Sequence, residues 1–458
     1  MDLFESKKAT GAFTDINANA ASLQYHEILP KSQPANYDVS TQLQFDFGGA
    51  TDRYVLLSES YFVVKYKVGY CPLATGTDEA DRKPMVAIPA GGVLKDTGVA
   101  TNDAKDALAL TLKPRFFNHC VSSIRHSING VDVESTNEAA TCASLRDISN
   151  AHSYDQSAGS AYRTSLTVNQ KLGSVDINQE CAYRPPLGLY DCKVPIGGAQ
   201  HSITFQLSNH NTYSAAVFDV PVTTDGSPNG KVAADFEKTA ATALASAGLI
   251  RNRDSYLFGI EEVSLMLCTV QPQSMIVPGP SLLIENRSIE VHRVDNSASR
   301  SINKQMQLPG STYRTDLFFS GDEPNGIDTS VAEPLDKEST KLESLALSVS
   351  GQAMYTPQLE GLMGTKIPMM PYTQYLATTG NLTNNAMSSV KDQEEFSKAP
   401  HYHCRVVQPP TTAPRDTVVR ANFSDGQART VVIGAHYSSA IALFYDASGH
   451  VTTVAINT

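Results

Sequence analysis

Hydrophobic and polar residues alternate along much of this chain, which is the pattern of β-strands with one buried face. The clearest instance is "SIRHSINGVDVEST", residues 123–136. Ile124, His126 and Ile128 alternate with polar residues before an Asn-Gly pair, and two valines alternate with acidic residues after it. Asn-Gly tolerates the two positive φ angles of a type I′ turn, whose twist suits a hairpin. The segment therefore predicts two short strands that turn at Asn129-Gly130.

The same alternation recurs on both sides of residues 219–255, a segment rich in Gly and Pro and then in Ala. Before it, the pattern occurs in "LQFDFGG", "SYFVVKYKV" and "HSITFQLSN". After it, the pattern occurs in "GIEEVSLMLCTV", "SLLIENRSIEVHRV", "SLALSVSGQAMY" and "TVVIGAHYSSAIALFYDASGHVTTVAINT". About eight short strands are expected on each side, and the βαβ rhythm of a parallel sheet is missing. The predicted fold is all-β: two eight-stranded antiparallel jelly-roll sandwiches in tandem, with long loops and a few short helices.

This pattern predicts four parts of the chain. An extended N-terminal arm, a first jelly roll, a linker with a helix and a second jelly roll are expected over residues 1–35, 36–218, 219–255 and 256–458, respectively. Apolar residues at three-residue steps between 139 and 148 predict a short helix inside the first jelly roll. Residues 72–108, rich in Gly, Asp, Thr and Ala, predict a long surface loop, and loops of that length are often functional.

Composition and charge narrow the function classes. The chain has 47 acidic and 36 basic residues, a net charge of −11, so it has no general attraction for the phosphate backbone of nucleic acids. The N-terminus, "MDLFESKKATGAF", lacks the basic and apolar regions of a secretory signal, and no stretch approaches the ~20 apolar residues of a membrane span. The seven cysteines form no CxxC pair and predict reduced, buried thiols.

Motifs of catalysis are missing from the sequence. It contains no G-x-S-x-G, no P-loop and no H-E-x-x-H. The sharpest metal candidate is "HYHC", in which His401 and His403 would share one face of a strand, with His436 on a later strand as a third ligand. Two histidines without a carboxylate at motif spacing are a weak signal for a metal, so we expect no catalytic residue, no cofactor and no bound metal.

The order of several motifs resembles a known family. A polar arm precedes "QFDFGGATDRYVLLSESYFVVKYKV"; a long loop is followed by "FFNHCVSSIRHSINGVDVES" and a helix. "RPPLGLYDCKVPIGGAQHSITFQLS", "SIEVHRV" and "QLPGSTYRTDLFFSGDEPNGI" come next, before a β-rich C-terminus. The chain is similar in this order to the double jelly-roll, hexon-like major capsid proteins of polinton-like and adintovirus-type small DNA viruses.

The resemblance implies a structural function rather than a catalytic one. It implies a homotrimer of pseudo-hexagonal outline that tiles an icosahedral virus shell, with penton or minor capsid proteins as further partners and no strong direct binding of nucleic acid. The expected location is the virion, assembled inside the host cell. Three alternatives stay open: a vertex, penton or single jelly-roll capsid protein, a spike, and a cupin-like metalloenzyme built on His401, His403 and His436.

Overall fold

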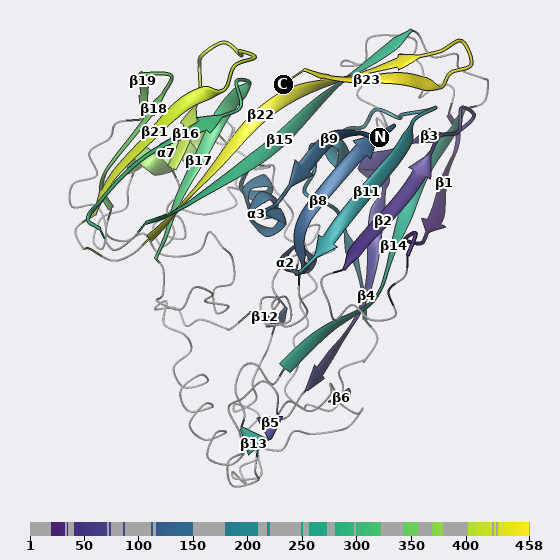
Figure 1. Ribbon diagram of the computed structural model, residues 1–458, viewed down its shortest axis with the longest axis horizontal. Coiled ribbons are helices and arrows are strands. Elements are labelled where there is room, and N and C mark those ends of the chain that lie inside the picture. Colours follow the sequence, from purple (N-terminus) through teal and green to yellow (C-terminus); the bar gives the residue numbers. More distant parts are fainter. Residues whose placement is uncertain are drawn as a thin grey trace.

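The computed structural model describes two β-sandwiches that lie side by side in the upper part of Figure 1, with one helix between them. The described residues are 20–32, 34, 41–70, 73–74, 86–87, 111–112, 116–149, 179–208, 218–219, 249–250, 256–272, 280–296, 299–321, 342–355, 369–378, 402–423, 426 and 429–457. Most of the expected loop 72–108 and of the expected linker lie outside them.

The first sandwich contains two antiparallel sheets. One has the order β1(Ala20–Ile28), β14(Tyr256–Pro272), β4(Tyr61–Tyr70), β10(Gln179–Tyr183). The other has the order β2(Gln42–Gly48), β11(Gln200–Leu207), β8(Val121–Ile128), β9(Val131–Thr136). Numbered from 1 to 8 along the chain, these strands lie in the orders 1-8-3-6 and 2-7-4-5, which is a jelly roll.

The second sandwich repeats this arrangement. Its first sheet has the order β15(Ser281–Asn296), β22(Arg429–Tyr445), β17(Thr312–Gly321), β20(Tyr402–Arg405). Its second sheet has the order β16(Ser301–Leu308), β21(Arg415–Phe423), β18(Leu342–Val349), β19(Gln352–Tyr355). The strand orders are again 1-8-3-6 and 2-7-4-5, so the prediction of two eight-stranded jelly rolls in tandem is confirmed.

Short elements complete the described part of the chain. The helices are η2(Leu57–Glu59), α2(Phe117–Cys120), α3(Ala139–Ser149), η4(Gly188–Asp191) and α7(Met369–Thr378). The additional strands are β3(Tyr54–Val55), β5(Leu73–Ala74), β6(Val86–Ala87), β7(Thr111–Leu112), β12(Phe218–Asp219), β13(Leu249–Ile250) and β23(Val451–Asn457). No helix among the described residues is long and apolar enough to cross a membrane.

The predicted hairpin forms as expected. Strands β8 and β9 pair on either side of Asn129 and Gly130, whose φ angles are 49° and 81°. The Asn129 side chain fixes the tip: its amide group donates to the carbonyl oxygen of Val451 at 2.6 Å, and its oxygen accepts from the backbone N–H of Gln200 at 2.8 Å. The turn of the first sandwich is therefore tied to β23 at the C-terminal end of the chain.

Two expected boundaries differ from the structure. Strand β14 begins the expected second jelly roll, but it pairs with β1 and β4 of the first sandwich. The reason is topological, because the last strand of a jelly roll lies between its first and third strands and closes the sheet after a long connection. Residues 20–28 of the expected arm are β1, an edge strand of that sheet, so the first sandwich extends from Ala20 to Pro272.

The two sandwiches share a hydrophobic core. Strands β15 and β22, of 16 and 17 residues, pair along their whole length and extend from the second sandwich onto the first. Their far ends and the adjoining β23 place five apolar side chains in the core of the first sandwich: Leu282, Ile284, Ile441, Leu443 and Val451. This shared packing joins the two sandwiches through one continuous apolar core.

Candidate functional site

Polar side chains gather on the outer face of the sheet β15-β22-β17-β20. Alternation along β17 places Leu317 in the core of the second sandwich and Phe318 in a separate apolar cluster with Leu145 of α3. Cross-strand register aligns Ile289, His436, Arg314 and Arg405 in one row across the four strands. Because directly paired residues share a face of a sheet, this row faces α3 and the first sandwich (Figure 1).

Asp316 is the centre of a buried polar cluster. Its Oδ1 accepts from Nε of Arg314 at 2.7 Å, and its Oδ2 accepts from Nη2 of Arg314 at 2.8 Å. Nδ1 of His403 lies 2.6 Å from Oδ1, and Nε2 of His436 lies 2.7 Å from Oδ2. The cluster joins three adjacent strands, because His403 lies on β20, His436 on β22 and the ion pair on β17.

The cluster has a defined charge. Burial alone would raise the pKa of Asp316, but the charge of Arg314 and the two histidines outweigh it and hold that pKa well below its ordinary value. Burial lowers the pKa of both His403 and His436, and the pull of Asp316 reverses this effect only in part. The arrangement is therefore a carboxylate neutralised by one guanidinium and hydrogen-bonded to two neutral imidazoles.

The structure brings two of the three predicted metal candidates together at one carboxylate. His403 and His436 meet at Asp316, whereas His401 lies outside the described residues. Among the described residues, no group of three or more His, Cys, Asp or Glu side chains is arranged to hold a metal ion. The guanidinium of Arg314 already supplies the positive charge next to the carboxylate.

Sequence reasoning missed Asp316 and Arg314. The available signal is "YRTDLFF", where an arginine and an aspartate occupy alternate positions of a strand segment that ends in three apolar residues. Charged residues on one face of such a strand need partners when they are buried. The partners come from strands about 90 and 120 residues later, so only the register could identify them.

A second polar network joins the two sandwiches. Glu134 of β9 is buried, and its carboxylate accepts from the backbone N–H groups of Gly188 at 2.8 Å and Leu189 at 3.3 Å. It also accepts from the hydroxyl of Ser288 on β15 at 2.7 Å. Gly188 is required here, because an added Cβ would lie 2.2 Å from the carbonyl oxygen of Arg287. The carboxylate thus couples η4 of the first sandwich to β15.

Replacing Glu134 by Gln is expected to loosen this junction. An amide offers one acceptor oxygen in place of two, so at least one of the three donors loses its partner, at a cost of about 1–2 kcal/mol. Urea denaturation would measure the free energy of unfolding, and hydrogen exchange would show faster exchange in η4 and β15. Glu343→Gln on β18 is the matched control because Glu343 is exposed. Equal stability of both variants would contradict the assigned role of Glu134.

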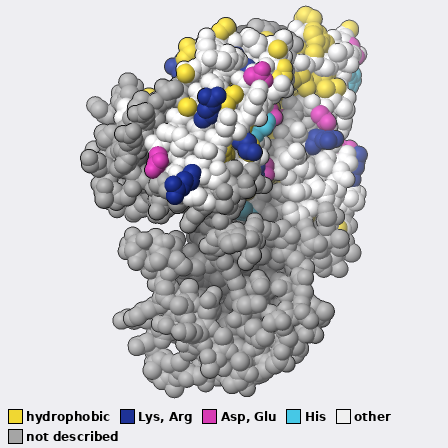
Figure 2. All heavy atoms as spheres, turned by 60° about the vertical axis from the view of Figure 1, so that its left-hand side comes forward, with side chains coloured by type: hydrophobic (Ala, Val, Ile, Leu, Met, Phe, Trp, Pro, Cys, Tyr) yellow, Lys and Arg dark blue, Asp and Glu magenta, His cyan; other side chains and the backbone are white. Residues whose placement is uncertain are grey.

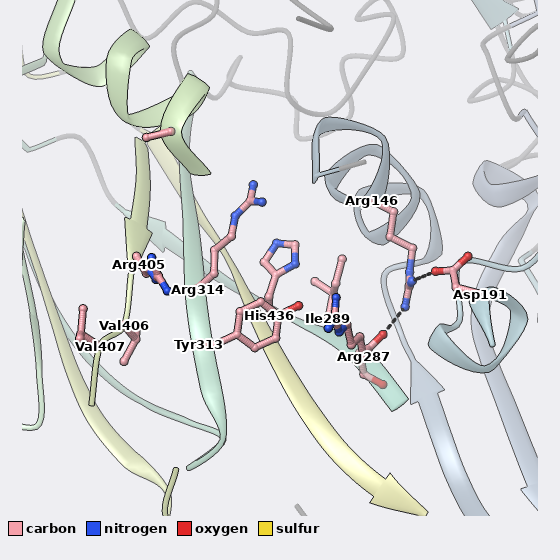
Figure 3. Close-up of a pocket in the computed structure, with 12 residues that line it drawn as sticks. Arg146, Asp191, Arg287, Ile289, Tyr313, Arg314, Arg405, Val406, Val407 and His436 are labelled. Atoms are coloured by element: carbon pink, nitrogen blue, oxygen red, sulfur yellow. Dashed lines mark hydrogen bonds and ion pairs between the residues drawn. The ribbon is translucent and has the colours of Figure 1, made fainter. Parts of the chain in front are cut away.

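Arginine side chains line a cavity of about 510 Å³ beside this junction (Figure 3). Arg146 reaches it from α3, Arg287 from β15, and Arg314 and Arg405 from β17 and β20. Tyr313, His436 and the valines 406 and 407 complete much of the wall. Arg146 is fixed by Asp191 at 2.5 Å and by the carbonyl oxygens of Pro186 and Arg287 at 2.9 and 2.8 Å. The cavity is therefore basic on a protein that is acidic overall.

Comparisons with known proteins identify the fold. The sequence matches no protein-family model and no curated protein. The structure of the Sputnik virophage, determined by cryo-EM, contains a chain that aligns with a TM-score of 0.52 and 11% identity, over 96% of this chain and 89% of that one. The quasi-atomic model of the PBCV-1 virus capsid aligns with a TM-score of 0.50 and 8% identity, over 94% and 97%. The mavirus major capsid protein aligns with a TM-score of 0.47 and 11% identity, over 95% and 90%.

These alignments extend over nearly the whole length of each chain. With identities near 10%, the likeness to the Sputnik and PBCV-1 chains concerns the fold. It agrees with the strand orders described above, in which two jelly rolls of equal topology follow each other in one polypeptide.

Proposed function

We propose that this chain is the major capsid protein of a virus, that three copies form a trimer of pseudo-hexagonal outline, and that these trimers tile an icosahedral shell without catalysing a reaction. The observation that carries the proposal is the repetition of one eight-stranded topology in two sandwiches that share a core. The full-length likeness to chains of the Sputnik virophage and the PBCV-1 capsid supports it.

The geometry suits a unit that tiles a surface. Three copies of a chain with two similar sandwiches present six similar sides, which is the condition for hexagonal packing. A shell is held by many repeated contacts between copies, so each copy must keep its two sandwiches at a fixed angle. The shared core, helix α3 and the carboxylate of Glu134 supply that rigidity.

Exposed apolar side chains supply candidate contacts between copies. Figure 2 shows hydrophobic side chains gathered at the upper end of the described surface, whereas charged side chains are scattered singly. The large exposed apolar residues include Leu23 and Tyr25 on β1 and Leu283 and Phe444 on the β15–β22 ribbon. Permanent assemblies bury such groups at the centre of their interfaces. Further partners would be penton or minor capsid proteins, and the location would be the virion.

The alternative functions have less support. Two complete sandwiches favour the double jelly-roll capsid proteins over a vertex or other capsid protein with one jelly roll. A cupin-like metalloenzyme would need an open metal site, but the carboxylate nearest to His403 and His436 is occupied by Arg314. The net charge of −11 also argues against strong binding of nucleic acid by the whole surface.

The mass of the purified chain in solution tests the proposal. We expect a stable trimer by light scattering, and hexagonal arrays or closed particles by negative-stain microscopy at higher concentration. A monodisperse monomer at high concentration would contradict the proposal. Metal analysis of the same sample separates the enzyme alternative, because metal bound in equal amount to the protein would favour a metalloenzyme.

A further inference from the structure

The arginine-lined cavity contains guanidinium N–H donors that the described residues leave unused. Arg314 donates hydrogen bonds from Nε and Nη2 to Asp316. Its Nη1 has no such bond to a described residue and is available to a ligand. Arg287 uses Nε for Glu285 at 3.1 Å, and its side chain is 62% exposed. Arg405 is exposed and has no ion pair with a described residue. These three guanidinium groups belong to three different strands of one sheet, so the fold holds them at fixed spacing.

Acidic groups around the cavity neutralise only part of this charge. Asp191 is engaged by Arg146 at 2.5 Å and lies 3.6 Å from Arg184. Asp316 is paired with Arg314, Glu285 lies 3.1 Å from Arg287, and the buried Glu134 lies 3.6 Å from Arg146. The charged residues that line the cavity are four arginines and one aspartate, and among the described residues Arg405 is the arginine of this set without an ion pair, so guanidinium groups outnumber carboxylates at the cavity wall.

We propose that this cavity binds a small oligophosphate compound, either inorganic or part of a nucleotide. Guanidinium groups match the oxygens of phosphate with pairs of parallel hydrogen bonds, and several of them around one cavity favour a multivalent anion. The volume of about 510 Å³ is within the range of small-molecule sites and exceeds the need of a single phosphate.

The uncharged part of the cavity wall can contact a group that is attached to the phosphates, such as the nucleoside of a nucleotide. Tyr313, with a 39% exposed side chain, and the valines 406 and 407 offer an apolar surface next to the arginines. A ligand here would contact Arg146 on α3 of the first sandwich and Arg405 on β20 of the second sandwich, so its binding stabilises the angle between the two bodies. This inference goes beyond the proposed capsid function and does not depend on it.

Isothermal titration of the purified full chain with inorganic pyrophosphate tests the proposal, with citrate as an anion of similar charge that lacks phosphate. We expect one saturable pyrophosphate site per chain and weaker binding of citrate. Because a hydrogen bond to a charged group is worth about 1.5–3 kcal/mol, the double variant Arg287→Gln/Arg405→Gln should bind pyrophosphate at least about tenfold more weakly. Arg420→Gln, an exposed arginine on β21, is the matched control and should bind like the unmodified chain.

A second titration with ATP distinguishes the two sources of phosphate. Tighter binding of ATP than of pyrophosphate would assign a nucleotide whose base contacts Tyr313, and equal binding would assign the phosphate chain alone. The proposal is overturned by unsaturable binding, by citrate binding as tightly as pyrophosphate, or by a double variant with unchanged affinity. A further result would also overturn the proposal: pyrophosphate and ATP fail to bind the unmodified chain, and the double variant no longer self-associates. In that case the cavity binds an acidic side chain of another copy instead of a phosphate.

Discussion

Replacing Asp316 by Ala is expected to lower the free energy of unfolding by about 3–5 kcal/mol. Arg314 is 7% exposed and would lose its one close anionic partner among the described residues. His403 and His436 would lose the acceptor that orients their rings. Removing one member of a buried ion pair leaves the other charged and unsolvated, which costs more than the pair itself contributes. Because the cluster joins β17, β20 and β22, the loss concerns a whole sheet.

Urea denaturation followed by circular dichroism measures this change. Asp416→Ala on β21 is the control, because Asp416 is exposed in the other sheet of the same sandwich. Asp316→Asn preserves the shape of the side chain and removes its charge, so a similar loss in this variant would assign the effect to charge rather than to a cavity. A loss below about 1 kcal/mol in Asp316→Ala would show that Arg314 finds another partner and that the cluster is not a stabilising element.

The sequence alone predicts local structure in this chain much better than pairing between distant strands. Leu43, Phe45 and Phe47 alternate and are all buried, and Asn129-Gly130 forms the expected turn, because both features depend on neighbouring residues only. Strand β14 also has the expected alternation, but its partners β1 and β4 lie about 190 or more residues earlier in the chain. No local pattern distinguishes the last strand of one jelly roll from the first strand of the next.

The polar sites show the same limit. The predicted metal candidates are His401 and His403 of "HYHC" with His436 of a later strand, and the structure brings His403 and His436 together, whereas His401 lies outside the described residues. Their shared partner Asp316 depends on the register of three strands, which the sequence does not display. The cavity needs Arg146 from the first sandwich and Arg405 from the second, so it exists only after the two sandwiches have packed.

Mild acid is expected to destabilise the first sandwich through a pair of buried histidines. Nε2 of His126 lies 3.1 Å from Nδ1 of His201, and both rings are fully buried. Burial lowers the pKa of His201 from 6.5 to about 4, and burial together with the neighbouring His201 holds the pKa of His126 well below its ordinary value. Phe47 stacks on His201 with a centroid distance of 5.3 Å and covers one face of its ring.

The direction of the effect follows from proton binding. Below pH 6.5 each of the two histidines binds a proton in the unfolded chain. In the folded chain they stay neutral until the pH approaches their lowered pKa values. The contribution of the neutral pair to the free energy of unfolding is therefore fully present above about pH 6.5, and it is lost as the pH decreases from there towards 4. At pH 5 His201 removes about 2 kcal/mol relative to pH 7.5, and His126 lowers the stability further in the same direction. Asp316 contributes little at pH 5, because its carboxyl group is ionised in both states there, whereas His403 and His436, whose pKa values burial also lowers, change the stability in the same direction as the pair.

Urea midpoints at pH 7.5 and pH 5 measure the loss, and His201→Gln separates this pair from other titrating groups. The variant contains only one of the two buried histidines, so its free energy of unfolding should fall by about 2 kcal/mol less than that of the unmodified chain between pH 7.5 and pH 5. His450→Gln is the control, because His450 is exposed at the turn before β23. Equal pH dependence of His201→Gln and the unmodified chain would exclude the pair as the acid-sensitive element. A smaller pH dependence of His201→Gln would show that acid weakens the hairpin β8–β9. The tip of this hairpin is bonded to β23, so the junction of the two sandwiches would loosen together with the first sandwich.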